Sequence, residues 1–148
     1  MVNNIRRVVT ANDQNGKSKV WIDDVSSTAK VSRPGVTGTV VWTTDTMPPD
    51  ITGSEDLGLR DVARPPVHQG TIFRVIEFEP GNTTDMHITE TIDYAIVLKG
   101  KIDMKLEQGP PVHLEEGDII VQRATLHDWV NTGKEACVIA FILIDAHE

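Results

Sequence analysis

The chain of 148 residues is poor in cysteine, in basic residues and in long apolar runs. Its single cysteine, Cys137, excludes an intramolecular disulfide and is expected to be a small core residue, which fits a reducing compartment. With 14 basic against 22 acidic residues the formal charge is −8, and clusters such as Arg6-Arg7 are too short to follow a phosphate backbone. No apolar run has the length of a signal peptide or a membrane span. We therefore expect a soluble, cytoplasmic protein without nucleic-acid or membrane partners.

The length suits one domain, and residues 1–45 are expected to form an N-terminal extension of it. Within that extension, β-type runs at residues 5–10 and 18–22 flank the turn signal Asn15-Gly16 and predict a hairpin. The β-branched residues of segment 36–44 predict a strand. These elements exceed what a minimal barrel needs. We expect them to cover a sheet edge, either in the same subunit or in the partner of a homodimer.

Residues 46–69 contain four prolines and little periodicity, which predicts a long loop that acts as a lid, a binding loop or an interface element. His68 in this loop is expected to be solvated. From residue 70 to residue 148, short apolar runs alternate with glycine and proline turns and predict strands, as in a sandwich or a closed barrel. His113, on one of these strands, is expected at the surface.

The alternation of the run Thr71–Glu79 places Arg74 in an unusual position. Arg74 shares one face with isoleucine and phenylalanine side chains, whereas the other face carries Glu77 and Glu79 and is expected to be the wetter one. An inward arginine is costly to bury unless it meets an anion. That anion is either Asp93 or a substrate carboxylate. Alternatively, the guanidinium bends to the mouth of the barrel.

Two later segments, residues 81–100 and 117–131, each combine a glycine turn, an apolar strand and a histidine. Side chains two apart on a strand share a face, so neighbouring members of each set are expected to point the same way. The side chains that stand out in the two segments are His87, Thr89, Asp93, His127, Trp129 and Asn131. Two hairpins of one design indicate a single small barrel with a single site.

The spacing of these residues resembles the motifs of the cupins. The first cupin motif runs Gly, five residues, His-x-His, three or four residues, Glu, six residues, Gly, and the second ends His, three residues, Asn. The matching positions are Gly81, His87, Thr89, Asp93, Gly100, Gly117, His127 and Asn131. The resemblance covers roughly residues 70 to 145 and implies an all-β fold, a single cupin-type β-barrel (double-stranded β-helix or jelly roll), here with an N-terminal hairpin extension. Residues 70–148 would form the barrel.

The chain departs from the cupin pattern at three places. Thr89 stands where the family has its second metal-binding histidine, and Asp93 stands where it has a glutamate. In the second motif, Arg123-Ala124 replaces a Pro-Pro-Gly turn in a version one residue shorter. The first two positions belong to the three-histidine, one-glutamate metal site of the family.

Two chemical interpretations of the site remain open. His87, Asp93 and His127 are the residue types of a facial triad that binds a divalent metal such as iron, manganese or zinc. Without metal, the same three residues with Arg74 form an acid–base set, in which the carboxylate orients an imidazole and the arginine holds a substrate anion. Each histidine alone could also be a buried structural residue.

The remaining candidates would bind substrate rather than react with it. Thr89 and Asn131 supply polar groups near the two histidines. Trp129, two residues after His127, would form a flat apolar wall for a cyclic substrate, or would simply pack in the core.

Three functional classes follow from these interpretations. The first is a small-molecule enzyme of lyase or isomerase type, which dehydrates, cyclises or decarboxylates an oxygenated organic acid or aromatic compound. The second is an iron(II)-dependent dioxygenase. The third is a non-catalytic module that binds a small ligand. The fold alone does not choose among them.

Overall fold

The structure is a computed structural model that describes residues 4–62 and 66–148. These residues form eleven strands and one short 3-10 helix, η1. The bounds are β1 Arg6–Asn12, β2 Ser18–Val25, β3 Lys30–Arg33, β4 Val36–Thr44, η1 Leu57–Leu59, β5 Thr71–Phe78, β6 Thr91–Lys99, β7 Lys101–Leu106, β8 Val112–Glu115, β9 Ile119–Arg123, β10 His127–Val130 and β11 Cys137–Asp145. Within the described residues, no helix is long and apolar enough to cross a membrane.

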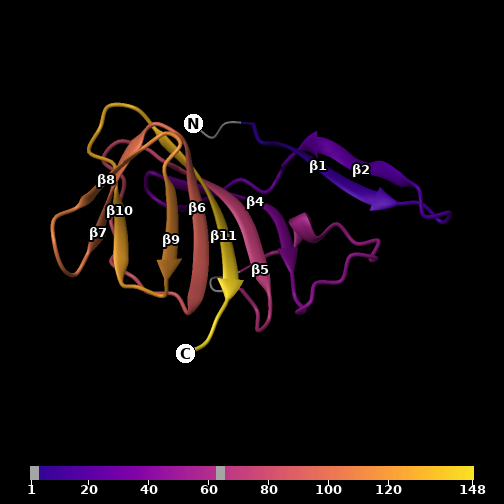
Figure 1. The fold of residues 1–148 in the computed structure, drawn as a ribbon. Coiled ribbons are helices and arrows are strands. Elements are labelled where there is room, and N and C mark those ends of the chain that lie inside the picture. Colours follow the sequence, from indigo (N-terminus) through magenta and orange to yellow (C-terminus); the bar gives the residue numbers. More distant parts are fainter. Residues whose placement is uncertain (1–3, 63–65) are drawn as a thin grey trace.

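Two sheets face each other and enclose the core, which confirms the expected all-β jelly roll (Figure 1). The larger sheet has the order β3-β4-β5-β11-β6-β9, and the smaller has the order β10-β7-β8. All the strand pairs are antiparallel, so consecutive strands can be joined by tight turns. Gly100, at φ 81°, makes the turn between β6 and β7, where a Cβ would lie 2.5 Å from the carbonyl oxygen of Ala136.

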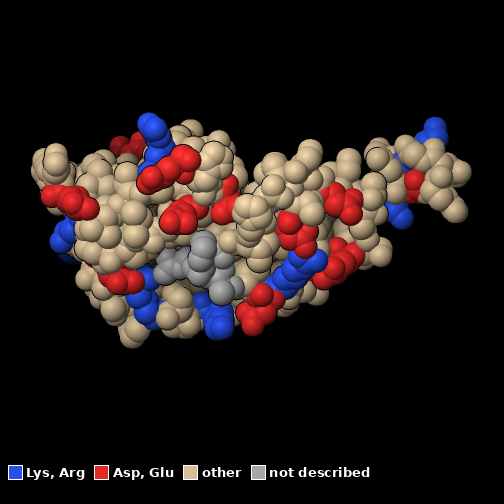
Figure 2. Space-filling model, turned by 90° about the horizontal axis from the view of Figure 1, so that it is seen from below, with Lys and Arg blue, Asp and Glu red and all other residues tan. Residues whose placement is uncertain are grey.

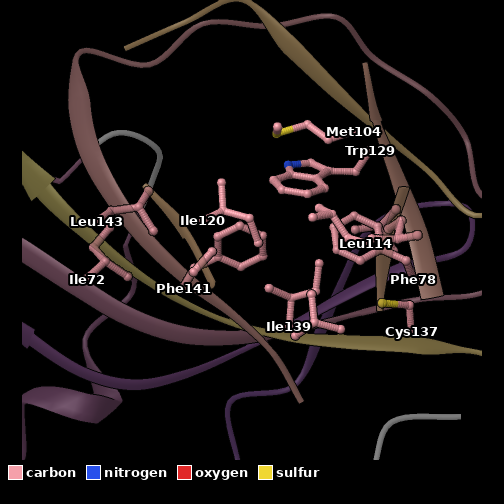
Figure 3. Close-up of a cluster of buried hydrophobic side chains, with 14 residues drawn as sticks. Ile72, Phe78, Met104, Leu114, Ile120, Trp129, Cys137, Ile139, Phe141 and Leu143 are labelled. Carbon is pink, nitrogen blue, oxygen red and sulfur yellow. The ribbon is translucent and has the colours of Figure 1, made fainter. Parts of the chain in front are cut away.

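The core lies between the two sheets and is built from side chains at alternate strand positions. Figure 3 shows Trp129 of the small sheet lying over Phe78, Phe141 and Ile139 of the large one. The ring centroids of Trp129 and Phe141 are 5.5 Å apart in an edge-on arrangement. Cys137 is fully buried in the same cluster, as expected of a small core residue, and burial raises the pKa of its thiol to about 11.

The large sheet begins earlier in the chain than residue 70. β3 and β4 pair with each other and β4 pairs with β5 along its whole length, from Val36 opposite Phe78 to Thr44 opposite Thr71. The large sheet therefore contains strands from both sides of residue 70, where the boundary between an extension and the barrel was expected. The β-branched run 36–44 is a strand, as expected, but it is an integral part of the barrel wall.

The predicted hairpin is formed by β1 and β2, which pair only with each other among the described strands. It projects beyond the barrel beside the loop that follows β4 (Figures 1 and 2). The hairpin adds no strand to either barrel sheet, whereas the strand 36–44 does pair along the edge of β5 in its own subunit. Cover of a partner's sheet edge by the hairpin stays a prediction. Trp21 of the hairpin meets Trp42 of β4 edge-on, with ring centroids 5.8 Å apart.

A buried arginine, Arg7, ties the hairpin to the barrel. Its guanidinium donates to Asp24 on the neighbouring strand, to Asp56 before η1, and to the carbonyl oxygen of Val41 in β4. Asp56 also accepts from the amide nitrogen of Gly58 and so caps η1. One cation therefore joins three elements that come from distant parts of the chain.

The outer face of β5 is more deeply buried than the sequence predicted. Glu77 is buried rather than solvated, and Val75 lies in a second apolar cluster with Val138 and Ala140. Ile5 at the start of the chain packs against this cluster. The side chains of β5 alternate between two faces as predicted. The face that carries the glutamates was predicted to be solvent-exposed, but a segment more than sixty residues away in the chain covers it.

Candidate functional site

A narrow cavity opens between the two sheets and gathers most of the sequence-predicted site residues. It offers about 80 Å³ to the centres of water-sized molecules, whereas one water needs about 10–15 Å³. The cavity therefore suits a small molecule or one end of a larger one. Its polar lining residues are Ser32, Arg33, Arg74, His87, Thr89, Asp93 and His127, and its apolar lining residues include Ile76, Phe78, Trp129, Phe141 and Leu143.

Strands β5 and β6 place Arg74 and Asp93 in this cavity. Both strands flank β11, where Arg74 is opposite Phe141 and Asp93 is opposite Leu143. Directly paired residues of antiparallel strands lie on one face, so both charged side chains emerge on the inner face. Arg74 thus lies among apolar neighbours, as its alternation predicts.

His87 and His127 are brought together by the backbone. The two residues form an isolated antiparallel bridge, in which each amide nitrogen donates to the other carbonyl oxygen at 2.9 and 3.0 Å. Their rings lie 4.4 Å apart, centroid to centroid. In each ring, Nδ1 lies 2.7 Å from the carbonyl oxygen two residues earlier, that of Asp85 or that of Thr125. A carbonyl oxygen only accepts, so both histidines carry a hydrogen on Nδ1.

The second ring nitrogen of His127 is also bonded within the protein. Its Nε2 lies 3.0 Å from the amide Nε2 of Gln122, and the amide oxygen of Gln122 accepts from the hydroxyl of Thr125 at 2.7 Å. The turn between these residues contains Ala124 at φ 50°, in the left-handed region that favours glycine. Ala124 thus takes a glycine-type conformation at the turn where the family has Pro-Pro-Gly.

Asp93 is the titratable group that the cavity perturbs most clearly. Burial raises the pKa of its carboxyl group, because the charged form loses its hydration. A hydrogen bond from Thr91, the charges of Arg74 and His87, and a hydrogen bond from Gln122 act in the opposite direction without reversing the rise in pKa. A carboxyl group with a raised pKa beside a cation suits proton transfer near neutral pH.

Four of the five other predicted positions, Thr89, Trp129, His68 and His113, lie where the sequence placed them. Thr89 and Trp129 line the cavity, and Trp129 is also part of the core, while its expected role as a wall for a cyclic substrate stays a prediction. His68 is exposed in its loop.

His113 is exposed on β8 and bonded to Asp103, as expected of a surface residue. Asn131 is absent from the described lining of the cavity, and its expected substrate-binding role stays a prediction. Its buried amide donates to the carbonyl oxygens of Phe78 and Glu135 and accepts from the amide nitrogen of Gly133. Asn131 therefore holds the turn after β10.

Sequence reasoning missed Gln122 and Arg33. Gln122 lies two residues after the buried Ile120 on β9, so a polar residue at an inward strand position was the available signal. Arg33 ends the edge strand β3 and lines the cavity while its Nε donates to the carbonyl oxygen of Thr83. No local pattern marks Arg33, because only the pairing of β3 with β4 brings it there.

The family metal site does not fit the residues present. Among residues 4–62 and 66–148, no group of three or more His, Cys, Asp or Glu side chains is arranged to hold a metal ion. Both ring nitrogens of His127 are bonded within the protein, and the third histidine position is Thr89. The proposed ligand set of His87, Asp93 and His127 for iron, manganese or zinc is therefore not assembled in this structure.

Comparison with known proteins identifies relatives of the chain. The Cupin domain family matches residues 74–144. The chain is 27% identical over 148 residues to the cupin-domain-containing oxidoreductase fogC of Aspergillus ruber, covering 96% of this chain and 73% of that protein. It is 32% identical over 114 residues to the cupin-domain-containing oxidoreductase srdD of Neurospora crassa, covering 74% and 58%. It is 36% identical over 102 residues to the phomopsin biosynthesis cluster protein D of Diaporthe leptostromiformis, covering 66% and 54%. The chain thus spans between 54% and 73% of the length of these three proteins.

Solved structures show the same fold. The polyketide cyclase RemF from Streptomyces resistomycificus superposes with a TM-score of 0.54 at 19% identity, covering 78% of this chain and 72% of that one. KdgF from Halomonas sp. gives a TM-score of 0.51 at 18% identity, covering 78% and 84%. Together with the two facing antiparallel sheets and the motif spacing, these matches show that the chain belongs to the cupin superfamily.

Proposed function

We propose that this protein is a small-molecule enzyme that moves protons on an enolisable organic anion, as in an isomerisation, cyclisation, dehydration or decarboxylation. The observation that carries the proposal is the placement of Asp93 in a narrow cavity with Arg74 and His87. Burial raises the pKa of the carboxyl group and so tunes it toward proton transfer, and the guanidinium of Arg74 supplies positive charge.

The substrate enters with its anionic group toward Arg74. Arg33 adds a second guanidinium to the lining, so the cavity offers two cations and a single carboxylate side chain among its described residues. Such a balance favours a carboxylate, an enolate or a phenolate. Trp129, Phe78 and Phe141 provide the apolar wall for the carbon skeleton.

In an isomerisation, cyclisation or dehydration, the reaction begins when ionised Asp93 takes a proton from a carbon next to a carbonyl group; in a decarboxylation, loss of CO2 forms the same enolate and a protonated Asp93 then supplies the proton. The electron pair of that C–H bond moves into the new C=C bond, and the carbonyl oxygen becomes an enolate oxygen that Arg74 stabilises. Asp93 then returns its proton to another carbon or to a leaving hydroxide. His87 lies near enough to favour the ionised form of Asp93, which is the form that accepts a proton.

The relatives support a small-molecule role without choosing the reaction. Proteins named for phomopsin and oryzine biosynthesis clusters are among them, which fits a substrate of secondary metabolism. Others are named oxidoreductases, and this observation favours an iron-dependent dioxygenase as the second candidate. Two observations argue for the proton-transfer reaction. Both ring nitrogens of His127 are hydrogen-bonded within the protein, and no three-ligand cluster occurs among the described residues.

The test is proton exchange from solvent. Acetoacetate, benzoylacetate and 2-hydroxyacetophenone are incubated with the protein in deuterium oxide, and loss of the C–H signal is followed by NMR. We expect the wild type to accelerate exchange of at least one probe, and Asp93→Asn to lower that rate by about 100-fold or more, the usual effect of losing a general base.

The matched control is His113→Ala, which removes an exposed histidine far from the cavity lining and should leave the rate unchanged. Exchange that is as fast in Asp93→Asn as in the wild type contradicts the proposal. Tight binding of the probes without any accelerated exchange would assign the protein to the non-catalytic binding class.

A further inference from the structure

Gln122 connects two titratable groups of the cavity through one amide. It is 5% exposed, on β9 opposite Asp93 of β6. Its Nε2 lies 3.0 Å from Nε2 of His127. Its Oε1 accepts from the hydroxyl of Thr125 at 2.7 Å. The amide nitrogen and the amide oxygen of Gln122 thus each have a hydrogen-bond partner.

The direction of these bonds fixes the state of His127. The Nδ1 of this ring carries a hydrogen, because its partner at 2.7 Å is the carbonyl oxygen of Thr125. The amide nitrogen of Gln122 has only hydrogens to offer, so Nε2 of His127 must accept. A ring that donates from Nδ1 and accepts at Nε2 is a neutral imidazole of one tautomer.

We propose that Gln122 is a positioning residue for the proton-transfer reaction assigned to this cavity, a role that rests on the proposed function. Its amide holds His127 neutral and holds the carboxylate of Asp93 in register with it. His127 then takes no part in moving protons, and Asp93 with His87 performs the reaction. The two histidines of the bridge thus have different roles, although their backbones and their Nδ1 contacts are alike.

The test reads the ring nitrogens of His127 directly. Uniformly ¹⁵N-labelled protein is studied at pH 7.5 by long-range ¹H–¹⁵N correlation, which separates the neutral tautomers from the imidazolium. The wild type is expected to show one neutral species with hydrogen on Nδ1. Gln122→Glu replaces the donor by an acceptor and should convert His127 to the doubly protonated ring. Gln122→Met should shift Nε2 alone, because it removes the hydrogen bond without supplying an acceptor.

Thr125→Val is a second test of the same interaction, and it leaves Gln122 in place. It removes the hydroxyl that orients the amide oxygen, so the Nε2 signal should broaden or shift as the amide loses its fixed direction. Gln108→Met is the matched control, since Gln108 is exposed in the turn after β7 and should change neither ring signal. A purely structural Gln122 would alter the melting temperature in these variants while the His127 signals kept their neutral form.

Kinetics complete the test. Gln122→Met should lower kcat for deuterium exchange by about 100-fold while KM changes little, as expected when a reacting group is misaligned but the binding groups remain. Identical His127 signals in wild type, Gln122→Glu and Gln122→Met overturn the inference, whatever the activity. If the signals change as expected but the wild type exchanges none of the probes, Gln122 still positions His127 and only the proposed reaction is wrong.

Discussion

Asp93 is a carboxyl group that the fold holds where ionisation is unfavourable. Its folded pKa is raised above that of an unfolded aspartate, so the folded state binds the proton more tightly than the unfolded state does. The stabilising effect of the protonated form is complete below the unfolded pKa and is lost as pH rises through the folded pKa. At neutral pH, therefore, the charge on Asp93 lowers the stability of the protein.

Asp93→Asn should remove this penalty while it abolishes activity. We expect a higher melting temperature than wild type at pH 7, and a difference that shrinks as pH falls toward the ordinary carboxyl range. Calorimetry or circular dichroism at several pH values measures it. The control is Asp103→Asn, since Asp103 lies outside the cavity beside the exposed His113. A variant that is less stable than wild type at pH 7 would identify Asp93 as a structural residue.

We expect Thr89 and Gln122 both to limit metal binding at this site. Thr89 lines the cavity at the third histidine position, and the amide of Gln122 occupies the lone pair of His127 that a metal would use. Thr89→His alone should therefore gain little affinity, whereas Thr89→His with Gln122→Ala should bind zinc tighter by orders of magnitude. Titration calorimetry with zinc chloride measures this, with Thr89→Ala/Gln122→Ala as the control. Equal affinity in Thr89→His and the double variant would show that Gln122 does not block His127.

At the residue scale, the sequence predicted which side chains meet but not how they are bonded. Motif spacing and strand alternation were sufficient to bring His87, Asp93, His127 and Arg74 to one cavity. The bond of Gln122 to His127 and its place opposite Asp93 arise from the turn at Ala124 and from strand pairing between β6 and β9. Neither is visible in a local pattern, because each depends on residues that fold together from separate segments.

At the element scale, the hairpin depends on the buried cation that joins it to the barrel. An isolated two-stranded hairpin is marginal in water, and Arg7 bonds Asp24, Asp56 and Val41 across three elements. Arg7→Ala should therefore lower the free energy of unfolding by about 3 kcal/mol, the low end for breaking a buried ion pair because Asp24 is half exposed. Denaturant unfolding measures the change.

Arg6→Ala is the matched control for Arg7→Ala. Arg6 has the same residue type and a cross-strand aspartate partner, Asp23, but both side chains are exposed, so its loss should have little effect. Arg7 also holds the pKa of Asp56 below its usual range through a hydrogen bond, so this stabilisation is present at neutral pH and is lost as pH falls through the lowered pKa of Asp56. Equal effects of the two arginine variants would show that burial of Arg7 is not what matters.

The hairpin was predicted from local sequence patterns, but its docking on the barrel was not. The turn signal Asn15-Gly16 and its flanking β runs were sufficient to predict the hairpin. They carried no information on its docking, which involves Trp42 and Asp56 from distant segments. The burial of Glu77 was missed for the same reason, because its cover comes from elsewhere in the chain.

At the scale of the whole molecule, the outer face of the large sheet is unusually apolar. Phe73, Ile142, Tyr94 and Val121 lie in one row across β5, β11, β6 and β9, and Ile119 beside them is 73% exposed. The hairpin exposes apolar side chains as well: Val8, Val20 and Val25. Charged groups of both signs are interspersed on the face that Figure 2 shows. Apolar surfaces of this kind mark protein interfaces.

We therefore expect a two-fold homodimer in which the sheet face of one copy meets the other copy. Light scattering after gel filtration should give twice the 16.3 kDa of one chain. Ile119→Lys with Val121→Lys should give the mass of one chain, because burying two new charges in the interface is unfavourable. Val112→Lys, an exposed position on the small sheet, should leave the dimer intact. A wild-type mass of 16.3 kDa at every concentration would contradict the dimer.

The central claim is that Asp93 moves protons, with support from His87 and Arg74 and without a metal. The most direct measurement is the deuterium-exchange rate of wild-type protein before and after prolonged treatment with a strong chelator, with residual metal determined by mass spectrometry. We predict the same rate in both samples, since the bonded ring nitrogens of His127 and the threonine at position 89 leave no assembled ligand set. Loss of activity on chelation, followed by recovery when iron(II), manganese or zinc is added, would contradict the account and assign the site to metal-dependent chemistry.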